Sequence, residues 1–520
     1  MRTDKLRRVS LRVANCPERS KSLPRTLRSR AACSLFLLLG LGLTGCASVT
    51  DSIVDSSSES RREAMLGPSS NPVTVDNVGG NDRLRRLAAE QHPQIIASYG
   101  GEYNDPKLER MVARIVGELT TTGDNTTQIY NITVLDSPNI NAFALPGGYL
   151  YITRGLLALA SDSSELATVI AHEMAHVTAN HGIERQKMER AETVASRVAE
   201  DLLGSSNAAR AAAIRGQLRL AQFSRSQELA ADAIGIHATA TAGFDPYASV
   251  RFLRALSAYT RFRSVTGAKP ELDFLASHPT SERRMEIAQR LARQEGGPGV
   301  GTRARDAYLA GIDGMIFGDK ATEGFIRGRD FLHPRVGIGF RVPAGFVLDN
   351  SADAVTAAGP DDMAIRFDGV RVPRRTSLTD YLASGWIGGL DPNSVESGMV
   401  NGLPYARARA SADGWAFAIS VYRVDNTVYR LLTAAPVGTE RLAALADQTA
   451  GTFRILSQSE KTGLKPLRIK IVTAKQGDTV QSLARQMAGV ERKDELFLVL
   501  NGLDRNEPVK AGEKFKLVVE

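Results

Sequence analysis

Cysteine is nearly absent from this chain of 520 residues, which has only Cys16, Cys33 and Cys46. All three lie within the first 46 residues, so the rest of the chain has no cysteine pair and a disulfide framework is excluded. Ordinary hydrophobic cores and bound metal are therefore the expected sources of stability. The length predicts two to four domains.

An excess of charge of one sign is also absent from most of the chain. Residues 1–45 hold ten Lys or Arg and two Asp or Glu, which accounts for the whole formal charge of +8. The remainder is neutral, with 55 basic and 55 acidic residues. A broadly basic surface, as in proteins that bind nucleic acid, is therefore not predicted.

The apolar stretch at residues 31–43 is too short for a spanning helix. It follows an Arg-rich front and ends in Leu43-Thr44-Gly45-Cys46, which predicts a secretory signal over residues 1–45. The alternative is a signal anchor that stays uncut. Residues 46–80, rich in Ser, Asp, Asn and Gly, predict a flexible tether.

The Leu-Thr-Gly-Cys sequence resembles the lipobox of bacterial lipoproteins. This resemblance implies that Cys46 is the lipidated first residue of the mature chain. Ala47, rather than Asp, follows it, which in such lipoproteins implies an outer-membrane anchor. The predicted location is therefore the periplasm.

Histidine is scarce as well, with seven residues in the chain, yet two of them stand in one HExxH motif at positions 172–176. In a helix, His172 and His176 share a face one turn apart and can bind one Zn²⁺. Glu173 can then take a proton from a water bound to the metal. Asp162 and Glu165 predict the start of this helix. The alternative is a helix with two ordinary histidines.

A third ligand is expected downstream, within a helix predicted over residues 207–243. Glu228 and Asp232 share a face of that helix. A carboxylate can complete a His₂Glu zinc site and leave one position open for water. Asp232 could then contact a ligand histidine. Without HExxH, such a pair is usually a solvated surface pair.

Residues 141–155 predict a strand, a Pro-Gly-Gly turn and a second strand. An edge strand beside a metal helix can hold an extended peptide through main-chain hydrogen bonds. Asn141, Ala142 and Phe143 are the candidate residues for this role. An ordinary hairpin inside the core sheet is the alternative.

These motifs together resemble the gluzincin family of HtpX-type and CAAX prenyl endopeptidases, over about residues 80–295. They are most similar to its periplasmic branch, which includes the barrel-assembly-enhancing protease. The resemblance implies a mostly helical zincin domain with a small sheet at residues 81–295. The resemblance also implies that His172, His176 and Glu228 are the zinc ligands. Glu173 would be the general base, and Asp232 would orient a ligand.

His278-Pro279, with Arg284 six residues after the histidine, resembles the family's His-Pro motif near the rim of the active site. This resemblance makes His278 a candidate switch ligand that reaches the zinc and blocks it; a loop anchor is the alternative. The oxyanion donor stays open among Arg283, Arg284 and Tyr149. His181 is predicted to be a helix-end contact, and structural positions are predicted for His92, His237 and His333.

Downstream, the sequence predicts an α+β multidomain chain. A connector at residues 296–332, helical from 308 to 331, precedes an α+β sandwich-like domain at 333–458. The βααβ order of residues 467–520, with Gly477-Asp478-Thr479 and Asn501-Gly502-Leu503, resembles a LysM module. That resemblance implies peptidoglycan as a partner, with a scaffold role as the alternative.

The sequence therefore predicts a zinc metalloendopeptidase with one Zn²⁺ per chain, anchored by lipid in the bacterial envelope. The family resemblance implies unfolded or misassembled envelope proteins as substrates, hence a role in protein quality control. One alternative is a non-proteolytic lipoprotein chaperone or scaffold that binds peptidoglycan and envelope proteins. Another, from the LysM resemblance alone, is a peptidoglycan hydrolase.

Overall fold

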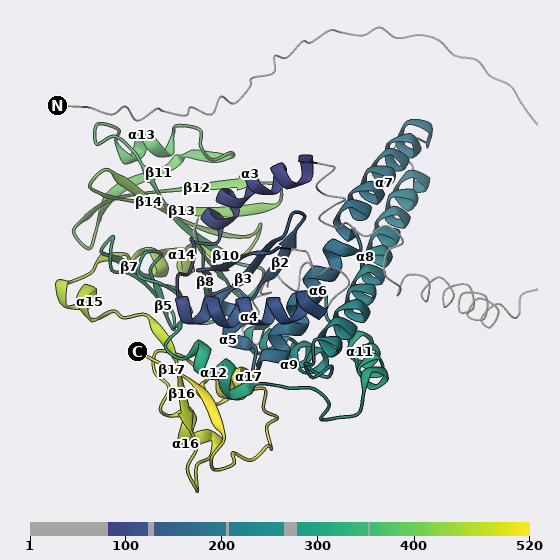
Figure 1. Cartoon of the computed structure of the whole chain (residues 1–520). Helices are drawn as coiled ribbons and strands as arrows, with labels where there is room; N and C mark the ends of the chain where they lie inside the picture. Colours follow the sequence, from purple (N-terminus) through teal and green to yellow (C-terminus); the bar gives the residue numbers. More distant parts are fainter. Residues whose placement is uncertain (1–81, 123–128, 204–206, 265–277, 352–353) are drawn as a thin grey trace, which may run out of the picture. The chain divides into compact units, whose positions relative to one another are not determined.

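The computed structural model describes residues 82–122, 129–203, 207–264, 278–351 and 354–520 (Figure 1). The predicted signal peptide, Cys46 and the tether lie outside these residues, so the lipid anchor stays a prediction. Within these ranges, no helix has the length and apolar character needed to cross a membrane. Helices are mixed with several small sheets, in agreement with the predicted α+β class.

The first sheet consists of β1 (Asn131–Leu135), β2 (Ala142–Leu145) and β3 (Tyr149–Thr153). Their order across the sheet is β1-β3-β2. β1 runs parallel to β3, whereas β2 pairs with β3 as an antiparallel hairpin. Gly147 and Gly148 make the hairpin turn with φ values of 94° and 86°, which glycine adopts at little cost. The predicted strand, turn and strand are confirmed, and β2 lies at the sheet edge.

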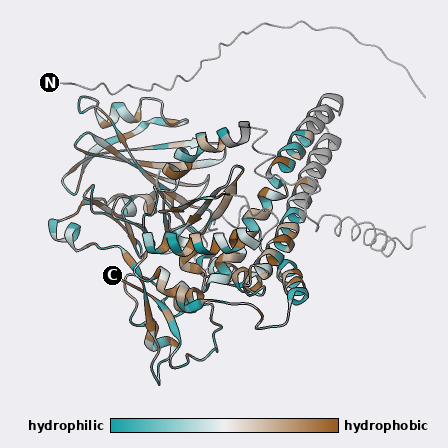
Figure 2. Cartoon of the chain, in the orientation of Figure 1, coloured by the Kyte–Doolittle hydropathy of each residue, from teal (hydrophilic) through white to brown (hydrophobic). Residues whose placement is uncertain are grey.

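Helices α4 (Pro106–Thr122), α5 (Arg154–Leu159) and α6 (Ser163–Thr178) contact this sheet. The other helices described up to residue 295 are α3 (Asp82–Ser98), α7 (His181–Leu203), α8 (Asn207–Thr241), α9 (Ala248–Ser264) and α11 (Glu282–Glu295). Asp105 caps the start of α4, because its Oδ1 accepts hydrogen bonds from the amides of Lys107 and Leu108. Figure 2 shows hydrophobic and hydrophilic residues alternating along α4, whose apolar side is buried.

The helix that carries HExxH begins as its sequence predicts. The Asp162 side chain accepts a hydrogen bond from the Glu165 amide at 2.9 Å, and Glu165 Oε2 accepts one from the Ser161 amide. α8 packs against this helix at Gly235, where an added Cβ would lie 3.0 Å from the backbone nitrogen of His172. The missing side chain therefore lets α8 approach the HExxH motif closely.

The α+β domain contains a seven-stranded sheet in the order β11-β12-β13-β14-β10-β9-β8, next to a four-stranded sheet in the order β15-β7-β6-β5. Along β14, Val428 belongs to one hydrophobic core whereas Tyr429 and Leu431 belong to another, so both faces of the larger sheet are covered.

In chain order, the strands of these two sheets are β5 Phe325–Arg327, β6 Asp330–His333, β7 Ile338–Arg341, β8 Val347–Asn350, β9 Val355–Ala358, β10 Ala364–Arg371, β11 Leu390–Val400, β12 Leu403–Ala412, β13 Trp415–Val424, β14 Thr427–Pro436 and β15 Arg454–Ile455. Their helices are α13 (Leu378–Leu382), α14 (Leu442–Ala450) and α15 (Gln458–Gly463).

The helical connector predicted over residues 308–331 is wrong beyond α12 (Arg305–Ile312). The chain continues as β4 (Ile316–Phe317) and then as the hairpin of β5 and β6. Gly324 and Gly328 have φ values of 89° and 61°, in the left-handed region that ends a helix. The strand β6 pairs with β7, so the sheet supplies the hydrogen bonds that a helix would have supplied.

The predicted βααβ order at the C-terminus is confirmed as β16 (Leu467–Thr473), α16 (Val480–Ala484), α17 (Lys493–Asn501) and β17 (Lys514–Val519). β4 extends this sheet by pairing with β16. Residues from this module share one hydrophobic core with the helices of the HExxH domain. Lys516, fully buried, donates to the carbonyl oxygens of residues 158, 159 and 160 at 2.8–3.1 Å, where α5 ends.

Candidate metal centre

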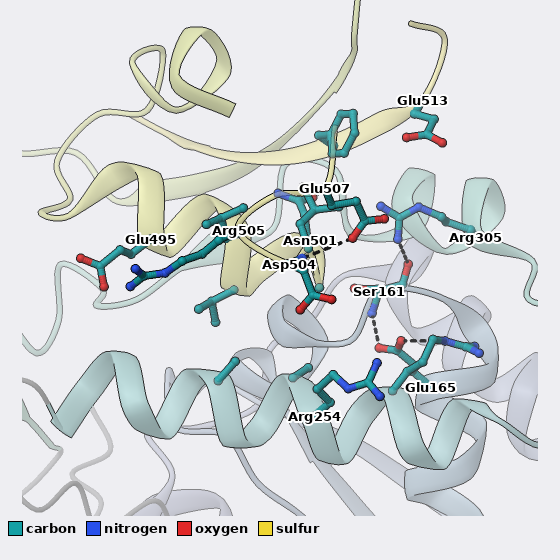
Figure 3. Close-up of a pocket in the computed structure, with 18 of the residues that line it drawn as sticks. Ser161, Glu165, Arg254, Arg305, Glu495, Asn501, Asp504, Arg505, Glu507 and Glu513 are labelled. Carbon is teal, nitrogen blue, oxygen red and sulfur yellow. Dashed lines mark hydrogen bonds and ion pairs between the residues drawn. The ribbon is translucent and has the colours of Figure 1, made fainter. Parts of the chain in front are cut away.

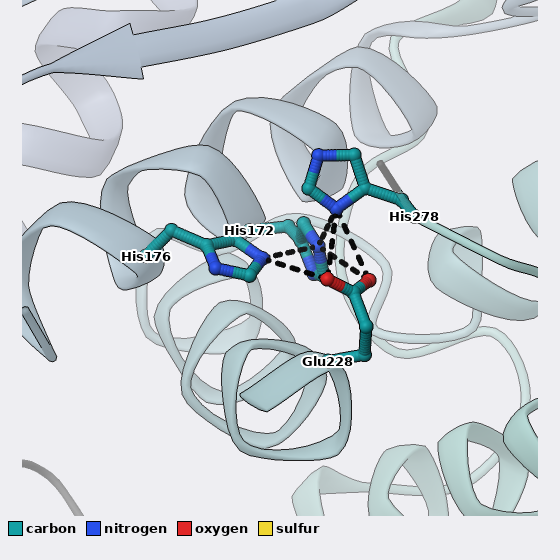
Figure 4. Close-up of side chains that lie close together, drawn as sticks. All are labelled: His172, His176, Glu228 and His278. Atoms are coloured by element: carbon teal, nitrogen blue, oxygen red, sulfur yellow. Dashed lines mark hydrogen bonds and ion pairs between the residues drawn. The ribbon is translucent and has the colours of Figure 1, made fainter. Parts of the chain in front are cut away.

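Four side chains from three parts of the chain converge on one point, as Figure 4 shows. One potential ligand atom from each lies within 4.8 Å of the others; we call this group the histidine–glutamate cluster, and it comprises His172, His176, Glu228 and His278. Helix α6 supplies the first two, α8 supplies the carboxylate, and the last lies just before α11. No other group of three or more potential ligands converges in the part of the chain described.

The spacing within the cluster fits a tetrahedral ion. His172 Nε2 lies 3.0 Å from His176 Nε2 and 3.3 Å from His278 Nδ1. Glu228 Oε1 lies 3.3 Å from His176 Nε2 and 3.0 Å from His278 Nδ1. Zinc bonds of 2.0–2.1 Å in a tetrahedron would place ligand atoms about 3.3 Å apart. The donor set therefore matches what Zn²⁺ takes.

Hydrogen bonds alone cannot pair all the nitrogen and oxygen atoms that meet in the cluster. His172 Nε2 faces two other imidazole nitrogens and, at 3.4 Å, a guanidinium nitrogen of Arg284. A ring nitrogen holds either one proton or one lone pair, so it cannot serve three donors or acceptors at once. Burial lowers the pKa of His176 to about 3, despite the opposing hydrogen bond to Glu228, and this ring is therefore neutral. A cation at the common point would use every lone pair directed there.

Glu228 and His172 are strongly polarised by their neighbours. Burial raises the pKa of Glu228, but hydrogen bonds from the surrounding imidazoles hold it far below its usual range. Burial lowers the pKa of His172, but Asp232 and Glu228 raise it to about 9. A metal that binds His172 must therefore displace a proton, and its affinity falls as the pH falls.

Glu173, the predicted general base of the HExxH motif, lies on α6 between the two histidines of the motif. Its side chain is buried, and Oε1 has no hydrogen-bond partner among the described residues, although it lies 3.5 Å from His278 Nε2. Burial raises the pKa of Glu173 above its usual range. A raised pKa makes a carboxylate a stronger base, which suits a group that accepts a proton and returns it.

Asp232 and Arg284 form a buried pair below the cluster. The guanidinium donates two hydrogen bonds to Asp232, at 2.6 and 2.8 Å, and its third nitrogen lies 2.9 Å from Glu228 Oε2. Asp232 Oδ1 also lies 3.0 Å from His172 Nδ1. Burial raises the pKa of Asp232, but Arg284 and His172 lower it to about 2, so this carboxylate is ionised. Arg284 is thus committed to two carboxylates, which argues against an oxyanion role.

The remaining histidines have ordinary partners except one. His92 contacts Tyr151, His237 contacts Glu295, and His333 accepts from a backbone amide. His181, expected only at a helix end, places Nδ1 3.0 Å from Nδ1 of His176. The helix-end position agrees with the prediction, since α6 ends at Thr178 and α7 begins at His181, but the contact with His176 was not predicted. The signal was present in Asn180, a residue type that often ends helices.

The edge strand β2 packs against α6, the helix that carries HExxH. The Asn141 amide donates to Thr153 Oγ1, and its side chain donates to Tyr99 Oη. Phe143 stacks on Tyr151 with ring centroids 4.7 Å apart. These contacts fix the hairpin, and β2 pairs with a strand on one side only among the described residues.

A separate cavity of about 860 Å³ shares no residue with the histidine–glutamate cluster. As Figure 3 shows, it lies between α9 and the C-terminal module, with Arg254 on one side and Asp504 on the other. Arg305 donates to the carbonyl oxygen of Ser161 at its margin. Acidic and basic side chains both line this cavity, so its charge favours no single class of ligand.

Residues 102–292 match the model of peptidase family M48, which confirms the resemblance predicted for about residues 80–295. The putative β-barrel assembly-enhancing protease of Vibrio cholerae is 34% identical over 37% of this chain and 40% of its own length. The β-barrel assembly-enhancing protease of Escherichia coli K12 is 32% identical over 40% of this chain and 43% of its own length. The mitochondrial metalloendopeptidase OMA1 of Schizosaccharomyces pombe is 29% identical over 39% and 59%.

The chain therefore spans about two fifths of the length of the first two relatives. Similar solved structures include cyanobacterial PsbP from Synechocystis, with 16% identity, a TM-score of 0.20, and coverage of 26% of this chain and 98% of that chain. A crystal structure from Bacteroides thetaiotaomicron has a TM-score of 0.21 and 11% identity, and covers 34% of this chain and 75% of that chain. Scores this low carry no argument about the fold.

The buried pair predicts a large stability difference between two Arg→Met variants. Arg284→Met leaves two buried carboxylates without their cation, so the free energy of unfolding of the metal-free chain should fall by about 3–5 kcal/mol. Arg341→Met removes a two-bond contact with Asp330 at an exposed site and should change little. Urea unfolding followed by circular dichroism measures both; equal midpoints would contradict the assigned role of Arg284.

Proposed function

We propose that this chain is a zinc-dependent endopeptidase that hydrolyses peptide bonds with metal-activated water, because residues 102–292 match the model of peptidase family M48. The convergence of two imidazoles from HExxH with Glu228 is the observation that supports it most directly. Bound Zn²⁺ would polarise the peptide carbonyl and lower the pKa of a water ligand to about 7. The proposed ligands are His172, His176 and Glu228.

Glu173 is the general base and acid in this proposal. It takes a proton from the attacking water and returns the proton to the departing amine. Asp232 holds His172 in place from behind, and Arg284 prevents the two neighbouring carboxylates from repelling each other. Water is the nucleophile, so no acyl-enzyme forms.

The edge strand β2 is the proposed binding site for the substrate backbone. An extended segment that pairs with residues 142–145 would add a strand to the sheet beside α6. This form of binding uses main-chain groups and requires an unfolded or locally extended substrate. Unfolded or misassembled envelope proteins meet that requirement, and two relatives carry the name of β-barrel assembly-enhancing proteases.

His278 is proposed as a fourth ligand that closes the site in the resting chain. Catalytic zinc sites keep one position for water, whereas four protein ligands make a closed site. His278 Nδ1 lies 3.3 Å from His172 Nε2 and 3.0 Å from Glu228 Oε1, and would supply a fourth donor to a bound ion. Activation would then require His278 to withdraw, so that water could take its place.

The location and partners complete the proposal. A lipid on Cys46 would anchor the chain to the membrane, in the periplasm and at the outer membrane. The C-terminal module, which resembles LysM, is the proposed contact with peptidoglycan. The closed four-donor arrangement also supports a second candidate, a lipoprotein scaffold or chaperone that does not cleave its clients.

Glu173→Gln distinguishes these two candidates. It removes the proton acceptor but no proposed ligand, so casein hydrolysis should fall by about 10²- to 10⁴-fold while zinc stays near one per chain. Glu184→Gln, on the exposed side of α7, is the control and should keep wild-type hydrolysis. Hydrolysis that persists in Glu173→Gln would rule out this mechanism. No hydrolysis in either the wild type or the opened variant His278→Ala would favour the scaffold.

His278→Ala tests the switch. It should leave three ligands and open the fourth position to water, so zinc should remain bound and casein hydrolysis should rise several-fold. His237→Ala, at an exposed ring that contacts Glu295, is the control. Zinc analysis and hydrolysis are measured together. Loss of zinc would make His278 an obligatory ligand, and unchanged hydrolysis would reduce it to a loop anchor.

A further inference from the structure

His181 lies behind His176, on the side of the ring that faces away from the cluster. The two Nδ1 atoms are 3.0 Å apart, and the ring planes meet at 75° with centroids 4.9 Å apart. Two ring nitrogens at this distance share one proton. Two N–H groups would collide, and two nitrogens without a proton would have their lone pairs facing each other. One ring must therefore donate and the other must accept.

The opposite side of His176 decides the direction. Its Nε2 faces His172 Nε2 at 3.0 Å and Glu228 Oε1 at 3.3 Å. If Nε2 supplies a lone pair to the metal, the proton of the neutral ring must be on Nδ1. His176 is then the donor, and Nδ1 of His181 is the acceptor.

From this geometry we propose that His181 is a positioning residue that accepts the Nδ1–H hydrogen bond of His176 and so keeps the Nε2 lone pair of His176 directed at the metal. The inference rests on the proposed zinc site. His181 is not itself a ligand in the proposal, because its Nδ1 faces His176 and it stands outside the cluster of converging ligand atoms.

The backbone holds His181 in this position. Asn180 has a φ of 57°, which turns the chain between α6 and α7 and brings the first residue of α7 back against α6. The carbonyl oxygen of His181 accepts a hydrogen bond from Gln227 Nε2 at 2.9 Å. Gln227 immediately precedes Glu228 on α8, so the helix that supplies the carboxylate also fixes the acceptor. His181 and Gln227 are both buried, each with an exposed fraction of 7%.

The two histidines of HExxH therefore have different supports. His172 has a carboxylate beside it, since Asp232 Oδ1 lies 3.0 Å from its Nδ1, although the angle is not that of a hydrogen bond. His176 has a neutral imidazole. An outer partner of a ligand histidine fixes its tautomer and ring orientation, and its removal typically weakens metal binding by about 10- to 100-fold.

Zinc affinity of the metal-free full-length chain, measured by competition with a chromogenic chelator, tests the proposal without relying on activity. His181→Phe keeps a ring but loses the acceptor, and should weaken zinc binding by about 10- to 100-fold. His181→Asn places a carbonyl oxygen near the former Nδ1 position and should restore affinity to within a few-fold of wild type. His237→Phe makes the same change at an exposed histidine and should have no effect.

The outcomes separate the two proposals. Wild-type affinity in both His181 variants would overturn the positioning role, and equal weakening of both would leave a packing role only. Failure of the wild-type chain to bind zinc would instead overturn the proposed function. Should His181→Phe not fold, ¹⁵N histidine spectra of the zinc-loaded wild type decide: the proposal requires Nδ1–H on His176 and Nε2–H on His181, and the reverse on His181 would contradict it.

Discussion

At Gly235 the backbone of α8 comes so close to α6 that an added Cβ would lie 3.0 Å from the His172 nitrogen. This approach brings Glu228, on the same helix two turns earlier, to the two histidines of HExxH. The site depends on it, because HExxH provides two ligands and a base but no third ligand. A larger residue at position 235 would push α8 away from α6, and Glu228 would move away from the two histidines with it.

Close helix packing also brings carboxylates together, and the structure balances their charge. Glu228 and Asp232 stand one turn apart in a buried region, where two uncompensated charges would be costly. Arg284 contacts both, and His172 lies between them. The same contacts that stabilise these groups orient them, so the stability of the fold and the geometry of the candidate site have a common origin.

Local patterns in the sequence were sufficient for parts of the site. The i, i+4 spacing placed His172 and His176 on one face, and Asp162 marked the start of their helix. Glu228 became a candidate only beside HExxH, because a lone Glu-x-x-x-Asp pair on a helix is normally solvated, and the family resemblance then named it as a ligand. His181 was missed, since its contact depends on a backbone turn at Asn180 that no single-helix pattern contains. The roles of these residues stay proposals.

Features that depend on contacts between distant parts of the chain were harder to predict, because no local pattern contains those contacts. The strands at residues 325–333 follow from pairing with β7, which lies beyond any local window. The C-terminal module was predicted as a separate unit with the correct order of elements. Nothing local in Lys516 indicated that its ammonium group is buried against the end of α5. Short-range signals thus identified elements, whereas contacts between elements required the structure.

X-ray absorption at the zinc edge of the purified chain tests the central claim most directly. We expect about one zinc per chain, with a first shell of nitrogen and oxygen atoms at about 2.0–2.1 Å and scattering from at least two imidazoles. A chain that retains no zinc, or a first shell dominated by sulfur at about 2.3 Å, would contradict the proposed metal centre.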